Sequence, residues 1–536
     1  MRNEFVAFSI LSTVLVSGIA YYVWSPMWWA FIFLGPIILL GYYDMFQIKH
    51  AINRNFPVLG RGRYIMEELR PKMYQYFIES DTSGTPINRI DRSIVYQRAK
   101  RELDTTPFGT QLRVYDDGYE WMNHSIGAKD FNHDAPDLRV KVGGPECMQP
   151  YSSSILNVSA MSFGSLSKNA VMALNGGARI GGFAHNTGEG GISPYHLKMG
   201  GDLIYQFGTA YFGCRDHAGN FSEYKFRMRM ENPEIKMVEV KLSQGAKPGH
   251  GGILPAGKNT PEIAAIRDVT AGTDVLSPPH HTAFDNPIGL MEFIHNLRVW
   301  SEGRPIGFKL CIGWRSEFLA LCKAMIKTGI YPDFITIDGG EGGTGAAPLE
   351  FSNSVGMPYR EALAFAHNAL VGFDIRDKMK IFASGKIITG FDMVKAFALG
   401  ADVCQSARAM MLALGCIQAL ECNQNTCPTG VTSQDPELVR GLVVKDKKQR
   451  VASYHKETVK SVSELTAAAG FDHPGQFDRY SINRRVSPNQ VMTYAEIYPY
   501  IGRGCLLFED SVPPQFDKDI ACADPGSFKP RFQEVN

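Results

Sequence analysis

Residues 380–431 read KIFASGKIITGFDMVKAFALGADVCQSARAMMLALGCIQALECNQNTCPTGV, in which two apolar runs each lead into a short polar turn. This pattern predicts strands at Ile381–Ser384 and Asp402–Ser406, with an amphipathic helix between them. The helix is expected to stop at Gly400, because glycine commonly occupies the position just beyond a helix. A strand, a helix and a second strand in this order indicate a parallel α/β fold.

The same alternation of apolar strand, glycine-containing turn and helix begins near residue 151. Eight strands with intervening helices predict a (β/α)8 TIM barrel, in which the C-terminal ends of the strands build the site. A doubly wound sheet is the alternative, but no GxGxxG sequence follows the first strand. The strand candidates are Ile155–Ala160, Gly181–Asn186, Tyr205–Phe212, Met237–Leu242, Gly307–Ile312, Phe334–Asp338, Ile381–Ser384 and Asp402–Ser406.

The turns after the last two strands have the composition of a phosphate site. Ser384, Gly385 and Lys386 follow the seventh strand, and Ser406 and Arg408 follow the eighth. Barrel phosphate sites use these two loops, where backbone N–H groups and a short helix N-terminus face the anion. An arginine adds a charge-assisted bond. The alternative is that these residues only form turns.

Three cysteines, Cys416, Cys422 and Cys427, follow this unit with the spacing C-x5-C-x4-C. Residues six and five apart do not share one helix face, so the segment either wraps around a bound group or carries unrelated thiols. Pro428 gives the Cys-Pro ending of ferredoxin-type runs. Three thiolates suit a three-iron cluster, or a four-iron cluster with an outside ligand, whereas structural zinc normally takes four ligands. A phosphate site followed by these cysteines suggests a flavin beside an iron–sulfur cluster.

Two N-terminal stretches, Phe5–Trp24 and Met27–Tyr43, contain no charged residue. Each is near the ~20 apolar residues that span a bilayer, and only two residues separate them. Basic residues at both outer ends favour a two-pass hairpin in the cell (inner) membrane, with the catalytic domain on the cytoplasmic side. A cleaved signal peptide and a buried helical pair are the alternatives.

The composition gives no reason to expect nucleic-acid binding, because 55 Lys and Arg balance 54 Asp and Glu. The ten cysteines are spread unevenly, mostly in apolar runs, which favours buried thiols in a reducing compartment. We expect four parts: a transmembrane hairpin at 1–47, a lead-in region at 48–150 that packs on the barrel, the barrel at 151–415, and an iron–sulfur segment with a C-terminal extension at 416–536.

Several long motifs occur in order between Ser159 and Gly441, among them SAMSFGSLS, NTGEGG, KLSQGAKPGHGG, LSPPHH, DGGEGGTGAAP and LGCIQALECNQNTCPTGV. On these motifs the chain resembles the FMN-binding synthase domain of glutamate synthase, in particular stand-alone glutamate-synthase-like proteins with an N-terminal membrane segment. The resemblance implies an FMN-binding barrel and a [3Fe-4S] cluster held by Cys416, Cys422 and Cys427.

The resemblance also implies roles for single residues. Lys309 would lie near the flavin pyrimidine ring, where a cation stabilises the reduced cofactor. Gln244, Lys247 and Arg267 would lie near the 2-oxo acid, since guanidinium binds carboxylate through two donors. Glu189 would handle a proton or ammonium. The alternatives are solvated charges and a turn residue. The expected cofactor contacts are Met161, Ser162, Lys309, Gly342, Gly343, Ser384, Gly385, Lys386, Ser406 and Arg408.

The implied activity is that of an oxidoreductase acting on CH-NH2 donors, the FMN-dependent reductive amination of 2-oxoglutarate to L-glutamate. Electrons would arrive through the cluster from ferredoxin, a flavoprotein or a membrane carrier. Full-length glutamate synthases begin with a glutaminase domain that has an N-terminal cysteine, whereas the first cysteine here is Cys147. We therefore expect ammonia or an amine donor from outside, with 2-oxoglutarate and membrane lipid as the other partners. One alternative is a different amino acid or an N-substituted glutamate; another is a membrane-tethered electron-transfer or scaffold subunit without its own substrate.

Overall fold

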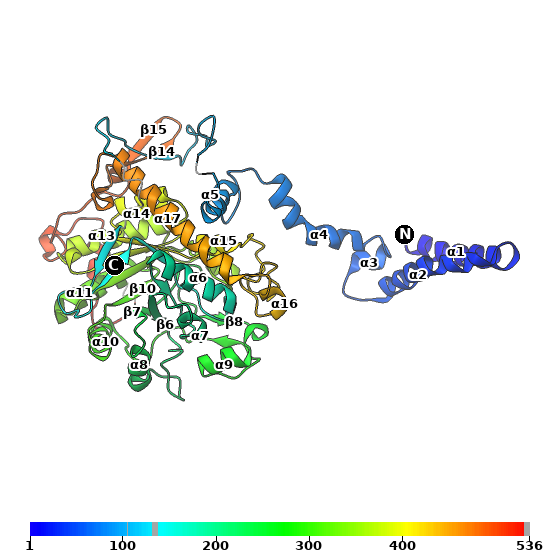
Figure 1. Cartoon of the computed structure of the whole chain (residues 1–536), viewed down its shortest axis with the longest axis horizontal. Helices are drawn as coiled ribbons and strands as arrows, with labels where there is room; N and C mark the ends of the chain where they lie inside the picture. Colours follow the sequence, from blue (N-terminus) through cyan, green and yellow to red (C-terminus); the bar gives the residue numbers. More distant parts are fainter. Residues whose placement is uncertain (104, 131–137, 530–536) are drawn as a thin grey trace, which may run out of the picture. The chain divides into compact units, whose positions relative to one another are not determined.

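The computed structural model describes residues 1–103, 105–130 and 138–529. Its contacts divide the chain into two compact units, Met1–Arg89 and a larger unit that begins at Ile90. Helices α1 to α4 of the first unit are drawn in blue in Figure 1, and the larger unit contains the barrel.

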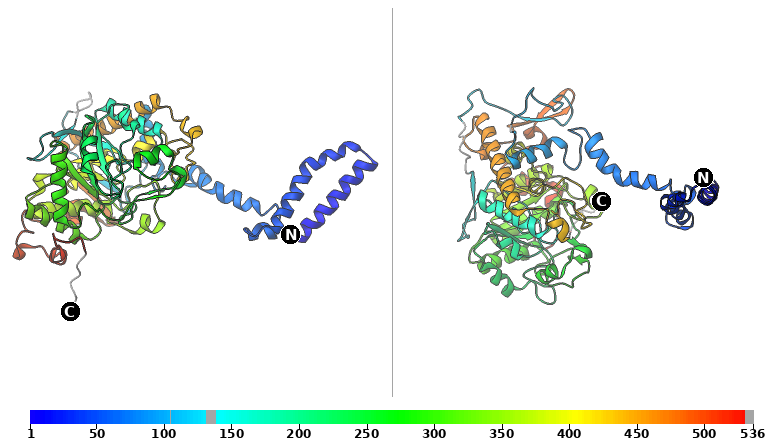
Figure 2. Two further views of the ribbon diagram at one scale, coloured as in Figure 1. Left: turned by 90° about the horizontal axis from the view of Figure 1, so that it is seen from below. Right: turned by 45° about the vertical axis from the view of Figure 1, so that its right-hand side comes forward.

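The first unit begins with a helical hairpin of α1 and α2, shown in Figure 2 as two helices side by side. The hydroxyl groups of Ser9 and Tyr42 are 2.8 Å apart, and the ring of Phe5 packs edge-on against Tyr42. By length and composition both apolar segments could cross a membrane, and most of each is exposed. The helices of this unit are α1 Arg2–Tyr22, η1 Ser25–Ala30, α2 Phe31–Phe46, α3 Ala51–Asn55, α4 Arg61–Met73 and η2 Tyr74–Ile78.

The larger unit is built around a closed barrel of eight parallel strands, which confirms the predicted fold. All eight predicted strands are present, Phe334–Asp338 with the predicted bounds and the others with shifted bounds. The second strand is shorter than predicted because Gly181 still belongs to a helix and Gly182 has the left-handed conformation that ends it. The barrel strands are β4 Leu156–Val158, β5 His185–Asn186, β6 Leu203–Phe207, β7 Ile235–Lys241, β10 Ile306–Leu310, β11 Phe334–Asp338, β12 Lys380–Ser384 and β13 Val403–Ser406.

The helix predicted between the last two strands is α14, and Gly400 follows it with φ +108°. Val394 and Phe397 of this helix are buried, and α14 also packs against α17. The helices between and after the barrel strands are α6 Lys168–Gly181, α7 Pro194–Leu197, α8 Glu223–Met230, η3 Ala256–Lys258, α9 Pro261–Arg267, α10 Pro287–Trp300, α11 Arg315–Thr328, α12 Leu349–Ser354, α13 Tyr359–Gly372, η4 Arg376–Lys378, α14 Gly390–Ala398, α15 Arg408–Leu414, α16 Pro436–Val439 and α17 Val444–Ala468.

A short hairpin of β2 (Arg139–Val142) and β3 (Tyr151–Ser154) supplies part of the core at the N-terminal end of the barrel. Val142 and Tyr151 join a buried cluster whose other members come from the barrel strands. The cluster contains Val142, Tyr151, Ala184, Ile204, Met237, Phe334, Phe382 and Val403. This apolar floor leaves the opposite, C-terminal end of the barrel for polar groups.

Residues that flank the barrel on both sides in sequence meet in a small antiparallel sheet. Strand β1 (Glu120–Met122) pairs with β14 (Ile482–Ser487), and Glu120 forms ion pairs with Arg360 and Lys395 on barrel helices. Helix α17 packs along α6. The remaining elements are α5 Arg89–Lys100, β8 Ile253–Leu254, β9 Val275–Leu276, η5 Pro474–Gln476, β15 Gln490–Thr493, α18 Tyr494–Ile497, η6 Glu509–Ser511 and α19 Asp517–Cys522.

Candidate active site

A layer of polar side chains lies inside the barrel, directly above its apolar floor. Side chains two residues apart on a strand point to the same face, so the residues that follow the floor residues by two also face inward. On six strands this second position is polar, and all six side chains are buried. They are Asn186, Gln206, Glu239, Thr336, Ser384 and Gln405.

Glu239 is the centre of this layer. It is fully buried, and its carboxylate accepts hydrogen bonds from Asn186 Nδ2 at 2.8 Å, Gln206 Nε2 at 2.6 Å and Thr336 Oγ1 at 2.5 Å. Three donors satisfy much of the hydrogen-bonding capacity of a carboxylate, which makes its burial tolerable. The network therefore fixes four strands at the middle level of the barrel.

Gln405 has no such partners. Its side chain is 1% exposed, and neither its amide nitrogen nor its amide oxygen has a hydrogen-bond partner among the described residues. Buried polar groups are rarely left unpaired, because the loss of water costs roughly 1–3 kcal/mol for each. An amide that can both donate and accept is thus left free on the inner face of β13, one position below Ser406.

Lys309 lies in the same interior, on β10, where its ammonium is 3.2 Å from the carboxylate of Asp338. Burial lowers the pKa of Lys309, but the charges of Asp338 and Glu239 outweigh it and raise this pKa above its usual value. Asp338 also accepts a 2.9 Å hydrogen bond from the backbone of Gly245. A fixed positive charge therefore stands near the C-terminal mouth.

A second charged cluster lies beside it, around Glu189 in the loop after β5. The Glu189 carboxylate is 2.8 Å from the ammonium of Lys241, which also donates a 2.5 Å hydrogen bond to Gln244 Oε1. Two glycines make room for this carboxylate: a Cβ on Gly252 or Gly208 would come within 2.5 or 2.6 Å of its oxygens. Side chains at either position would displace the carboxylate.

The charges around Glu189 decide its protonation state. Burial alone would raise the pKa of Glu189, but the positive charges of Lys241, Lys247 and, more weakly, Arg267 lower it overall. Glu189 is therefore an anion at neutral pH.

Lys247 is 3% exposed and donates one hydrogen bond, of 2.9 Å, to the carbonyl of Ala346. Burial lowers its pKa to about 8, while the charge of Glu189 acts in the opposite direction. An ammonium with three donors and one protein acceptor has capacity left for a ligand. Near neutral pH this lysine is charged, and it loses its charge within a unit or two above that.

Arg267, the last residue of α9, points back toward the loop after β4. Its Nη2 donates to Ser162 Oγ at 3.3 Å and to the carbonyl of Phe163 at 3.0 Å, and the guanidinium lies 5.2 Å from the centre of the Phe212 ring. Burial lowers its pKa to about 10, so it stays charged at neutral pH. Its Nε has no partner among the described residues. A buried guanidinium held only by neutral acceptors is suited to bind an anion.

The loops after β11, β12 and β13 come together at one side of the mouth. Arg408 donates a 2.9 Å hydrogen bond to the carbonyl of Glu341, and its side chain packs on Gly343, where a Cβ would be 3.1 Å from Arg408 Cδ. Lys386 has φ +46°, and burial, with the charge of Arg408, lowers its pKa. In the described part of the chain, the backbone N–H groups of Gly343, Gly385 and Lys386 have no backbone acceptor. Free N–H groups beside two cations are suited to bind an anion.

Other predicted contacts surround this mouth. Ser384 Oγ lies 3.3 Å from Ser159 Oγ, and Ser406 Oγ donates to the carbonyl of Ile387 at 2.6 Å. Gly188 packs directly against the Met161–Ser162 backbone, since a Cβ there would be 2.6 Å from the Ser162 nitrogen. Loops from different strands thus place many of the predicted residues around one opening.

The three predicted cluster ligands lie near one another but do not form a recognisable metal site. Burial, together with the charges of Cys422 and Cys427, raises the pKa of the Cys416 thiol to about 11. Lys258 donates a 3.2 Å hydrogen bond to the Cys422 carbonyl. Among the described residues, no group of three or more His, Cys, Asp or Glu has an arrangement that could hold a metal ion.

Sequence reasoning missed four residues of this site: Lys241, Glu239, Asp338 and Gln405. All four lie inside predicted strands, whereas most of the predicted site residues lie in the turns that follow the strands. The signal that could have found them is a charged or amide residue at every second position of an otherwise apolar strand.

The chain matches the family model described as the conserved region in glutamate synthase over residues 140–472. It is 37% identical over 500 residues to the glutamate synthase large subunit-like protein YerD of Bacillus subtilis (strain 168), covering 85% of this chain and 94% of that protein. It is 33% identical over 318 residues to the archaeal glutamate synthase [NADPH] of Methanocaldococcus jannaschii, covering 59% of each chain.

The large chain of glutamate synthase [NADPH] of Bacillus subtilis (strain 168) is 34% identical over 324 residues, but the chain spans only 20% of its length. Among solved structures, a mandelate oxidase matches with a TM-score of 0.40 and 15% identity, covering 80% of this chain and 96% of that one. So low a score carries no argument about this chain. The family match and the likeness to YerD together cover most of the sequence, and they include every residue of the site described above. The chain belongs to the glutamate synthase family, whose members are oxidoreductases acting on CH-NH2 donors.

Proposed function

We propose that this chain is a membrane-anchored, FMN-dependent enzyme that reductively aminates 2-oxoglutarate to L-glutamate, with electrons delivered through an iron–sulfur cluster. The observation that carries the proposal is the charged cluster at the barrel mouth. There Lys247 and Arg267 form no ion pair among the described residues, whereas Glu189 is paired with Lys241. The names of the relatives, which are glutamate synthases, support the same reaction.

The residues at the mouth fit FMN. The unpartnered amide of Gln405 offers a donor and an acceptor, which matches the alternating N–H and C=O groups of a flavin pyrimidine ring. Lys309 would stabilise negative charge on that ring. The loops of Gly343, Ser384, Gly385, Lys386, Ser406 and Arg408 offer free N–H groups and cations for the phosphate. When bound, FMN supplies two-electron redox chemistry.

The positively charged side chains at the proposed substrate site suit a dicarboxylate. Four cations (Lys241, Lys247, Arg267 and Lys309) and three carboxylates (Glu189, Glu239 and Asp338) meet at the site, so an anion improves the balance of charge. Lys247 and Arg267 bind and orient the acid, and Gln244, held by Lys241, lines the same side. The excess positive charge disfavours a cationic substrate that lacks a carboxylate of its own.

In this proposal, Glu189 interacts with the protonated nitrogen of ammonium or of the imine. As an anion beside Lys241 it can accept a hydrogen bond from ammonium or from a protonated imine, and it stabilises that positive charge. Its partner Lys241 keeps the carboxylate oriented.

The donor set of Cys416, Cys422 and Cys427 fits a [3Fe-4S] cluster in its chemistry, since three thiolates are soft ligands for iron. When bound, the cluster supplies one-electron transfer. Lys258, beside Cys422, adds a positive charge that favours thiolate over thiol. We propose ferredoxin or a flavoprotein as the electron donor and external ammonia or an amine as the nitrogen source.

The helical hairpin of α1 and α2 is proposed as a two-pass anchor in the cell membrane, with the catalytic unit on the cytoplasmic side. We propose four functional segments: an anchor at 1–47, a lead-in region at 48–150, the barrel at 151–415, and an iron–sulfur segment with its extension at 416–536.

The proposed reaction is tested by photoreducing the flavin of the purified full chain without oxygen and then adding 2-oxoglutarate and ammonium. The expected result is return of the oxidised flavin spectrum together with stoichiometric glutamate. Either compound alone serves as the control and leaves the flavin reduced. A flavin that stays reduced with both compounds present overturns the proposed substrate.

A further inference from the structure

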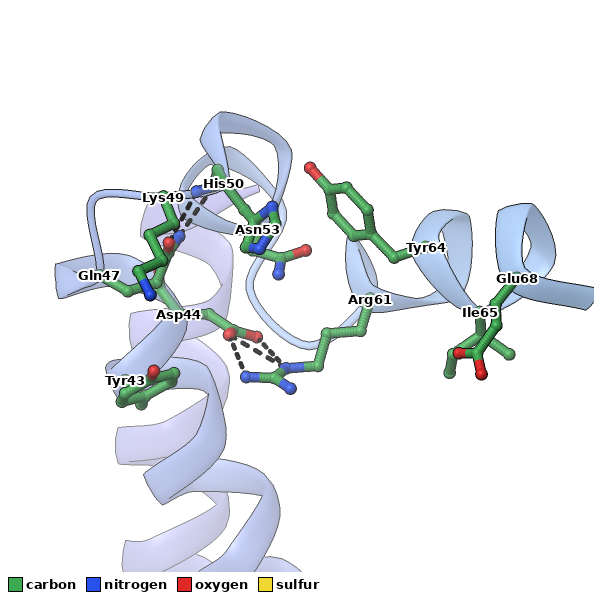
Figure 3. A pocket seen from close by; sticks show the side chains of 10 residues that line it. All are labelled: Tyr43, Asp44, Gln47, Lys49, His50, Asn53, Arg61, Tyr64, Ile65 and Glu68. Carbon is green, nitrogen blue, oxygen red and sulfur yellow. Dashed lines mark hydrogen bonds and ion pairs between the residues drawn. The ribbon is translucent and has the colours of Figure 1, made fainter. Parts of the chain in front are cut away.

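A cavity of ≈ 390 Å³ lies in the first unit, far along the sequence from the barrel residues. Its walls come from the C-terminal turn of α2, the turn that follows, α3 and the first two turns of α4 (Figure 3). It therefore lies directly beyond the second apolar helix, at the level where a membrane surface is expected if that helix spans the bilayer.

An ion pair fixes the frame of this cavity. Asp44, on the last turn of α2, is fully buried and accepts hydrogen bonds from Arg61 Nε at 3.0 Å and Arg61 Nη2 at 2.7 Å. The backbone N–H of Val58 donates a further bond of 3.0 Å to Asp44. These bonds join the start of α4 to the end of α2, and they use the charges of both residues within the protein.

The floor is held by a second set of bonds. Gln47 Nε2 donates to the carbonyl of His50 at 2.8 Å, and the backbone N–H of His50 donates back to Gln47 Oε1 at 2.8 Å. The ring of His50 packs against that of Tyr64 on α4, with centroids 4.6 Å apart. The cavity is thus bounded on two sides by contacts that do not need a ligand.

Two of the polar side chains that line the cavity, Asn53 and Lys49, have capacity to bind a ligand. Asn53 is 5% exposed, and its Oδ1 is buried without a hydrogen-bond partner among the described residues. Gly60 backs this amide, since a Cβ there would be 2.8 Å from Oδ1. Lys49 forms no ion pair within the described chain. The cavity therefore offers one cation, one buried acceptor and the carboxylate of Glu68, which together call for a ligand with an anion and an O–H or N–H donor.

The surroundings indicate where such a ligand comes from. Helix α4 and the turn η2 after it expose a series of large apolar side chains, interleaved with the basic residues Arg63, Arg70 and Lys72. Basic residues next to an apolar helix bind phospholipid headgroups, and exposed apolar stripes of this kind lie in the membrane interface. The exposed apolar residues are Ile65, Met66, Leu69, Met73, Tyr74, Tyr76, Phe77 and Ile78.

We propose that this cavity binds the headgroup of a phospholipid that carries a hydrogen-bond donor, such as phosphatidylethanolamine or phosphatidylglycerol. Lys49 takes the phosphodiester, and Asn53 Oδ1 accepts from the ammonium or hydroxyl of the headgroup. Glu68, also on the cavity wall, adds attraction for an ammonium. Phosphatidylcholine has the same phosphodiester but no donor. The inference rests on the anchoring part of the proposed function.

The test measures binding of short-chain phosphatidylethanolamine, phosphatidylglycerol and phosphatidylcholine, and of inorganic phosphate, to the full chain in detergent by native mass spectrometry. We expect the two donor-carrying lipids to bind about tenfold more tightly than phosphatidylcholine, as one buried hydrogen bond provides. Inorganic phosphate is expected to bind more weakly than any of the three. Equal binding of all lipids overturns the role of Asn53, and binding of phosphate as tight as that of the lipids overturns a lipid ligand.

Variants separate the two contacts. Asn53→Leu should remove the preference over phosphatidylcholine, and Asn53→Ala gives the same readout if the larger side chain disturbs the fold. Lys49→Ala should weaken all three lipids about equally, whereas Lys518→Ala, at an exposed position on α19 of the larger unit, should change none. A carbonate wash that releases the full chain from membranes overturns the anchor itself; retention without lipid preference overturns only the cavity proposal.

Discussion

The carboxylate of Glu189 lies 2.8 Å from the ammonium of Lys241, so this ion pair of the barrel mouth is already complete within the protein. Among the described residues, Lys247 and Arg267, by contrast, donate hydrogen bonds only to carbonyl and hydroxyl oxygens. Lys241 therefore orients a carboxylate of the protein, whereas the charges of Lys247 and Arg267 can interact with an anionic ligand.

Arg267→Ala should weaken binding of 2-oxoglutarate on the order of 100-fold, because a buried charged partner of the substrate is lost. FMN binding should change by less than a few-fold. Both dissociation constants can be measured by titration of the flavin spectrum. Arg215→Ala is the matched control, since Arg215 lies over the same Phe212 ring but is partly exposed. Equal loss of both ligands in Arg267→Ala contradicts the assignment.

Binding of 2-oxoglutarate should weaken as the pH rises through about 8. Burial lowers the pKa of Lys247 to about 8, so the side chain is charged below that pH and neutral above it. Only the charged form attracts a carboxylate. Lys247→Arg should retain affinity at pH 9, because arginine does not titrate there. A pH profile of the dissociation constant that is the same in both proteins excludes this role for Lys247.

Glu189→Gln should lower turnover by on the order of 10²- to 10⁴-fold while FMN remains bound. It should also move the pH dependence of 2-oxoglutarate binding to a lower pH, because the charge of Glu189 raises the pKa of Lys247. The second effect reports on the charge of Glu189 alone. A pH profile that stays in place would show that Glu189 is neutral in the native enzyme.

Gln405→Leu should weaken FMN binding about tenfold, as expected when a buried amide loses its bonds to a ligand. The measurement is FMN affinity by fluorescence quenching, with the position of the flavin absorption bands as a second readout. Gln490→Leu, at an exposed position on β15, is the control. Unchanged affinity would mean that the amide of Gln405 bonds to something other than the cofactor.

Cys422→Ser should remove most iron and the electron paramagnetic resonance signal of anaerobically purified protein, with FMN content unchanged. Cys505→Ser, at another partly buried cysteine of the same unit, should keep both. Iron that persists in Cys422→Ser argues against a cluster at the three cysteines.

The barrel could be predicted from the sequence because its apolar strands and glycine turns alternate regularly. The polar interior of the barrel could not be predicted, because the local sequence does not show which face of a strand lines the interior. Glu239 and Gln405 lie within otherwise apolar strands. Arg267 illustrates a second limit. Its contact with Ser162 joins α9 to the loop after β4, and no spacing in the sequence indicates that approach.

The division of the chain's contacts at Arg89 and Ile90 has no local signal in the sequence. The pairing of β1 with β14 illustrates the reason, because residues 120–122 find their partners in a strand near the other end of the chain. Contacts between segments so distant in sequence leave no local pattern.

Closure of the barrel between β13 and β4 has a consequence for how a ribosome delivers this protein. The apolar hairpin leaves the exit tunnel first, and β4 follows long before β13 exists. Until β13 has been translated, one edge of β4 is unpaired and can pair with other chains. We therefore expect membrane insertion to precede barrel closure. Nascent chains are then held apart on the bilayer during the time in which the edge of β4 is unpaired.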